Sequence, residues 1–113
     1  MDALPIEEFA RWWRETGEHE LRQVLLWRWD PIGVADWFPS AADEYDSYAP
    51  QLVQVLRNGG DTDAVMTCLR NVELDAMGLP GTSPERLREV ARVIDEWYGN
   101  SQKHWSEFGP IPR

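Results

Sequence analysis

The clearest structural signal in the chain is SPERLREVARVIDEWY, which runs from Ser83 to Tyr98. Its serine can cap a helix, and the proline that follows suits a first helical turn. The apolar residues then recur with helical spacing, at Leu87, Val90, Ala91, Ile94, Trp97 and Tyr98. The pattern predicts an amphipathic helix that ends at the turn signal Gly99-Asn100. Residues 101–113 then form a C-terminal tail, either packed through Trp105 and Phe108 or partly disordered.

Working outward from this helix, helical periodicity recurs upstream. The predicted segments run from about Pro5 to Trp13, Glu18 to Trp27, Ala42 to Asn58, and Asp61 or Thr62 to Met77. Gly17 interrupts the first two, which form either one kinked helix or two. Pro50 is awkward inside the third, so either its main helix starts near Pro50 or a short helix over 42–48 bends into it. Asn58-Gly59-Gly60 ends it.

These segments predict an all-α fold, a small bundle of four to five helices with an ordered Trp-rich loop over 29–41. No alternating strand pattern and no internal repeat stands out in the 113 residues, a length that suits one domain. We therefore expect a single helical domain over 1–100 followed by the tail. Trp13 aligns with Ile6 and Phe9 on one face of the first helix, so Trp12 should point to a second helix, to the tail or to a partner.

The charge of the chain excludes some partners. Twenty acidic and eleven basic residues give a net charge of −9, which disfavours nucleic acid and anionic membrane surfaces because both need a basic face. The single Cys68 rules out an intrachain disulfide and predicts core packing. No signal peptide and no membrane span is visible, so a cytoplasmic location is the simplest interpretation.

The acidic residues do not have the spacing of a known metal site. Asp30, Asp36, Asp43, Glu44 and Asp46 are hard oxygen ligands, but they do not match a calcium-binding loop. Neither His19 nor His104 has a second histidine at ligand spacing. We therefore expect no metal, no cofactor and no catalytic activity, and keep a carboxylate metal-binding protein as an alternative.

The segment from Trp37 to Tyr48 is the most suggestive of a binding surface, because it interleaves carboxylates with aromatic rings. Rings can anchor a partner, and carboxylates can accept bidentate hydrogen bonds from arginine. The rings could instead pack inward while an aspartate caps a helix. The predicted partner-binding residues are Asp36, Trp37, Asp43, Glu44, Asp46 and Trp12.

Two motifs, W-D-P-I-G from Trp29 to Gly33 and D-E-Y-D-x-Y from Asp43 to Tyr48, resemble a family of small uncharacterised bacterial proteins. A short amphipathic helix, a second helix and Met77-Gly78 complete the resemblance, which covers about residues 20–80. The resemblance implies an all-helical fold, and some members of the family look like immunity proteins, the small inhibitors that protect bacteria from toxins. Its signature residues are Trp29, Asp30, Pro31, Gly33, Tyr45 and Asp46. We expect this signature to be mainly structural, with Trp29 and Tyr45 pinning the loop.

Together these features predict a non-catalytic protein-binding module, most concretely an immunity-type inhibitor of a basic toxin such as a nuclease. Such a protein should associate quickly and in a salt-dependent way. The alternative from another class is a structural or regulatory homodimer that hides Trp12 and the tail at its interface. A monomer or a weak homodimer is compatible with the sequence.

Overall fold

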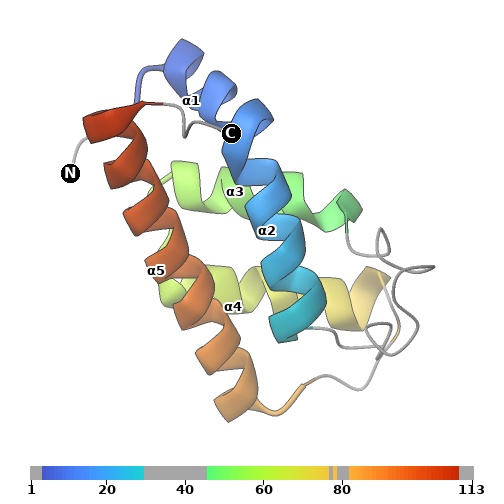
Figure 1. Cartoon of the computed structure of the whole chain (residues 1–113). Coiled ribbons are helices and arrows are strands. Elements are labelled where there is room, and N and C mark those ends of the chain that lie inside the picture. Colours follow the sequence, from blue (N-terminus) through green and yellow to red (C-terminus); the bar gives the residue numbers. More distant parts are fainter. Residues whose placement is uncertain (1–3, 30–45, 77, 79–81, 110–113) are drawn as a thin grey trace.

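The computed structural model describes residues 4–29, 46–76, 78 and 82–109. Within these residues the chain is all-helical, with no strand, as predicted. The described residues form four helical arms (Figure 1). They are α1 and α2 with their π turns, α3, α4 with its π turn, and α5.

The first arm is one helical run rather than two helices. It consists of α1 (Ile6–Trp12), a π turn η1 (Trp13–Gly17), α2 (Glu18–Val24) and a second π turn η2 (Leu25–Trp29). The junction residues keep right-handed helical backbone angles, so Gly17 does not break the run. A Cβ atom on Gly17 would lie 2.7 Å from the ring of Trp12. The absence of a side chain at Gly17 therefore leaves the space that the Trp12 ring occupies.

The predicted core face of this run is wrong at Ile6 and Trp13, whereas Trp12 points to a second helix, one of the three alternatives. The Trp12 side chain is completely buried, whereas Trp13 is only partly buried and Ile6 is 65% exposed. The rings of Trp97 and Tyr98 lie 5.8 Å from the Trp12 ring, and its Nε1 donates a hydrogen bond to Ser101 Oγ at 2.9 Å. Trp12 is thus covered by the last helix and cannot touch a partner in this fold.

The second arm settles the position of Pro50. A 3-10 turn η4 (Asp46–Tyr48) leads into α3 (Ala49–Arg57), which has the proline in its first turn. Proline is tolerated there because the first amides of a helix have no intrahelical acceptor. The expectation that the main helix starts near Pro50 is confirmed.

The third arm begins with the predicted cap. Asp61 accepts a hydrogen bond from the amide of Ala64, and α4 (Thr62–Asn71) continues through a π turn η5 (Val72–Ala76). Val65, Leu69 and Val72 are buried, as their spacing predicted.

The last arm, α5 (Pro84–Phe108), starts as predicted, with Ser83 capping the amide of Arg86. Its predicted end at Gly99-Asn100 is wrong, because the helix runs nine residues past Gly99 to Phe108. Glycine in a helix costs only about 1 kcal/mol. The extra turns bury Trp105, whose Nε1 donates to Glu8 Oε2 at 3.0 Å. The first residues of the expected tail are therefore part of the domain.

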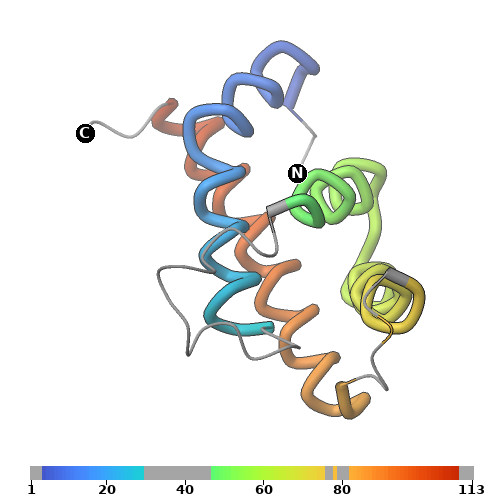
Figure 2. The backbone as a smooth tube through the Cα atoms, turned by 90° about the vertical axis from the view of Figure 1, so that its right-hand side faces the viewer, coloured from blue at the N-terminus to red at the C-terminus, as the bar shows by residue number. Residues whose placement is uncertain are grey.

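The arms form two pairs. The α1–α2 run and α5 lie antiparallel, and the α3–α4 pair crosses them, so that α3 and α4 are seen nearly end-on in Figure 2. α4 makes the most extensive contact with α5. The largest fully buried apolar side chains come from all four arms: Trp12, Trp29, Leu21, Leu25, Leu26, Leu52, Leu69, Leu87, Ile94 and Val65.

Two of the arms and the residues just before α5 meet at a buried carboxylate, Glu73 in η5, whose side chain has no exposed surface. It accepts hydrogen bonds from Trp29 Nε1 at 2.8 Å, from the amide of Thr82 at 2.8 Å and from Thr82 Oγ1 at 2.6 Å. Burying a carboxylate is tolerated only when such donors replace its water. Glu73 thus ties the ends of the first and third arms to the approach to α5.

Candidate functional site

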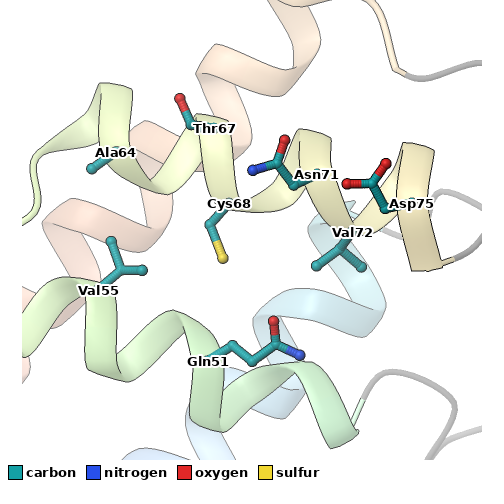
Figure 3. Close-up of a pocket in the computed structure, with 8 residues that line it drawn as sticks. All are labelled: Gln51, Val55, Ala64, Thr67, Cys68, Asn71, Val72 and Asp75. Carbon is teal, nitrogen blue, oxygen red and sulfur yellow. The ribbon is translucent and has the colours of Figure 1, made fainter.

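A groove with a volume of about 640 Å³ lies between α3 and α4. We call it the α3–α4 groove (Figure 3). Two of its lining residues come from α3, and the others come from α4 and η5. They are Gln51, Val55, Ala64, Thr67, Cys68, Asn71, Val72 and Asp75.

The two ends of the groove differ. At one end a tight turn joins the helices, where the amide of Gly60 donates to the carbonyl oxygen of Val55 at 2.9 Å. A Cβ atom on Gly60 would lie 2.7 Å from the Val55 side chain, so the turn packs directly on α3 and closes this end. The other end, where α3 begins and η5 follows α4, carries the polar side chains of Gln51, Asn71 and Asp75.

The interior of the groove is apolar. Figure 3 shows the side chains of Val55, Cys68 and Val72 directed into the space between the two helices. Burial raises the pKa of the Cys68 thiol above its ordinary value, because the thiolate loses hydration there. The thiol therefore stays protonated at neutral pH and is a poor nucleophile. These features suit reversible binding of an apolar group.

The electrostatics favour a cationic group at the polar end. Asp75 is exposed there, and none of the eight lining residues is lysine, arginine or histidine. The chain as a whole carries a net charge of −9. A cation approaching this end is therefore attracted both by the long-range field and by a local carboxylate.

A second, smaller cavity of about 320 Å³ lies between the first arm and α5. Trp12, Trp97 and Trp105 help to line it, together with Glu20. Trp97 Nε1 donates to Glu20 Oε1 at 3.0 Å, and Ser101 Oγ lies 3.5 Å from the same oxygen. These hydrogen bonds join the first arm to α5, so we interpret this cavity as part of the helix packing.

Most of the predicted partner-binding and signature residues lie outside the described residues. These are Asp30, Pro31, Gly33, Asp36, Trp37, Asp43, Glu44 and Tyr45. Of the remainder, Asp46 begins the turn η4 that leads into α3, Trp12 is buried, and Trp29 is buried against Glu73 and Tyr48. The loop that Trp29 was predicted to pin lies outside the described residues, so this role stays a prediction.

Glu73 and the groove were not predicted. Glu73 lies four residues after Leu69 and eight after Val65, so its spacing placed it on the buried face, and this signal was available in the sequence. The groove could not be read in this way, because it depends on how far apart α3 and α4 lie.

The described part of the chain holds neither a candidate metal cluster nor a candidate membrane span. No group of three or more His, Cys, Asp or Glu side chains there could hold a metal ion. The 25 residues of α5 are enough to cross a bilayer, but charged side chains occur along its length. None of the described helices is both long and apolar enough to span a membrane.

Comparison with known proteins adds no further constraint. A scan against protein-family models, a search of curated proteins and a search of solved structures each found no match. The resemblance carried by the W-D-P-I-G and D-E-Y-D-x-Y motifs therefore remains an expectation from the sequence, and the case for function depends on the site itself.

Proposed function

We propose that the chain is a non-catalytic protein-binding module, most concretely an immunity-type inhibitor of a basic bacterial toxin such as a nuclease. The observation that carries the proposal is the α3–α4 groove, which has an apolar interior and a carboxylate at its polar end. Apolar anchors surrounded by polar groups are typical of the centre of a protein interface.

The acidic segment supports the same proposal through its connection to the groove. Asp46, the last acid of the segment, opens the turn that leads directly into α3, and Gln51 on the next helical turn lines the groove. Because α3 and α4 are antiparallel, this is also the end at which Asp75 lies. The chain connectivity thus brings the end of the acidic segment to the polar end of the groove.

The homodimer alternative was suggested by the expectation that Trp12 and the C-terminal tail lie at an interface between two copies. It required Trp12 and the C-terminal aromatic residues to be free for an interface, but Trp12 and Trp105 are buried within one chain. Phe108 is 70% exposed at the end of α5, and Ile6 is exposed at the start of α1, at the same end of the bundle (Figure 1). The described residues give no reason to prefer a second copy over another partner there.

The proposal is tested by capturing a partner from a lysate of the source cells and purifying it. We expect a basic protein whose toxic activity is stopped by an equimolar amount of this chain. Association should slow at least about ten-fold between 0.05 and 0.5 M salt, because steering by exposed charges is screened.

A matched pair of variants separates local from overall charge. The variant Asp43→Ala/Glu44→Ala/Asp46→Ala should lose most of the rapid association. The control Glu89→Ala/Glu96→Ala/Glu107→Ala removes the same charge from exposed positions on α5. If the two variants bind alike, or if the purified partner is acidic, the proposal is wrong.

A further inference from the structure

We infer that the α3–α4 groove binds an extended segment of the basic partner, which inserts one large apolar side chain beside Cys68 and places an arginine against Asp75. This inference rests on the proposed function and adds to it the form of the partner's binding segment. It is carried by the shape of the groove, the polar groups at its rim and the spacing of its two ends.

The shape of the groove sets the apolar anchor. Val55 projects from α3, Cys68 and Val72 project from α4 and η5, and all three point into the same space (Figure 3). The turn at Gly60 packs on Val55 and closes the space at one end. A space that is apolar inside and closed at one end suits a single inserted side chain, as in the anchor pockets of protein interfaces.

The rim favours an extended backbone over a helix. Gln51 and Asn71 are exposed on opposite walls, and each side-chain amide can both donate and accept hydrogen bonds. An extended segment has backbone N–H and C=O groups that need such partners on binding, whereas the backbone groups inside a helix already bond to one another.

The spacing sets the position of the arginine. Asp75 lies seven residues after Cys68, which corresponds to about 10 Å along a helix at ~1.5 Å per residue. A segment in the extended polyproline II conformation covers this distance in about three residues, at ~3.1 Å each, and its three residues per turn direct side chains three positions apart to the same side. Arginine is favoured over lysine because its guanidinium can donate two hydrogen bonds to one carboxylate. The expected motif is a large apolar residue followed three positions later by arginine.

Cys68 makes this testable, because it is the single cysteine of the chain. The probe is a capped synthetic peptide, Ser-Leu-Ser-Ser-Arg-Ser, and the measurement is the rate at which iodoacetamide alkylates Cys68 in the folded protein. For a dissociation constant on the order of 1 mM, a peptide concentration about ten times higher should slow alkylation about ten-fold.

Two control peptides and one variant isolate the contributions. Replacing the leucine by glycine should abolish protection, and replacing the arginine by glutamate should reduce it at least about five-fold, as expected for exchanging an attractive for a repulsive charge contact. The variant Asp75→Asn removes an exposed carboxylate and should bring the arginine and glutamate peptides to similar protection. No protection by the arginine peptide, or equal protection by both peptides on the unaltered protein, would overturn the inference.

The failure of this inference can be told apart from the failure of the proposed function. Suppose that the chain inhibits a basic toxin, but Cys68 in the complex stays as reactive as in the free protein. The assignment of the groove as the binding site would then be wrong, while the proposed function would stand. If the arginine peptide protects Cys68 but the captured partner is acidic, the proposed function is wrong, while the assignment of the groove as a binding site for such a segment stands.

Discussion

Alanine in place of Gly17 is expected to destabilise the fold, whereas alanine in place of Gly99 is expected to stabilise it. Both glycines lie within helical runs, where alanine is normally favoured by about 0.5–1 kcal/mol because it loses less backbone entropy on folding. The surroundings differ. A Cβ atom at Gly17 would lie 2.7 Å from the Trp12 ring, and a Cβ atom at Gly99 would have no heavy atom within 4 Å, setting aside the atoms of its own helix turn and chain neighbours.

The magnitude follows from this comparison. The backbone gain is common to the two variants, so it cancels in the difference between their free energies of unfolding. What remains is the cost of the clash with Trp12, whose ring is held between neighbours such as Phe9 and Trp97, at centroid distances of 5.3 and 5.8 Å. Overpacking of this kind costs about 1–3 kcal/mol. Gly17→Ala should therefore be less stable than Gly99→Ala by about that amount.

Urea unfolding followed by far-ultraviolet circular dichroism measures the difference. With a slope of about 1–3 kcal/mol per M, the midpoints of the two variants should be about 1 M apart. In a Trp12→Phe background, which removes the outer ring that the new methyl group meets, Gly17→Ala should lose most of its cost. Equal midpoints for Gly17→Ala and Gly99→Ala would refute the role of Gly17 in leaving space for the Trp12 ring.

Three further outcomes are expected. Glu73→Gln should lower the free energy of unfolding by about 2–3 kcal/mol, because one amide oxygen cannot serve three donors. The exposed control Glu89→Gln should change the free energy of unfolding by less than about 1 kcal/mol. Similar urea midpoints for the two variants would contradict the stabilising role of the Glu73 hydrogen bonds. Deleting residues 101–113 should unfold the protein or cost at least about 3–5 kcal/mol, since it removes the buried Trp105, whereas deleting 110–113 should leave thermal stability nearly unchanged. Because burial raises the pKa of the Cys68 thiol in the folded state, the free energy of unfolding should fall as the pH rises from the pKa of the unfolded thiol through the folded value. Urea titrations between about pH 8 and 10 measure this decline, and Cys68→Ala should make it shallower. An unchanged decline in Cys68→Ala would show that the thiol is not its source.

The sequence by itself determined the features that depend on residues within a few helical turns of one another. The caps at Asp61 and Ser83, the prolines in first turns and the buried face of α4 were all predictable. Each depends on local hydrogen bonds or on periodicity within one helix, which the order of residues specifies directly. The all-α class followed from their sum.

The tertiary structure decided which of two adjacent side chains is buried and where a helix stops. Trp12 is buried instead of Trp13 because α5 lies against it, and α5 continues past Gly99 because Trp105 packs on the first arm. The burial of an aromatic ring exceeds the cost of about 1 kcal/mol for a glycine in a helix. The two residues in each of these contacts are more than 80 positions apart in the sequence, so the contacts cannot be predicted from periodicity within one helix.

The candidate site divides in the same way. The sequence identified an acidic segment that ends at Asp46, because the charges lie close together in the chain. The α3–α4 groove exists only once the turn at Gly60 folds α4 back on α3 and sets the distance between them. The charge of the chain led us to propose a basic partner, whereas the groove to which we assign that partner's side chain is a property of two packed helices.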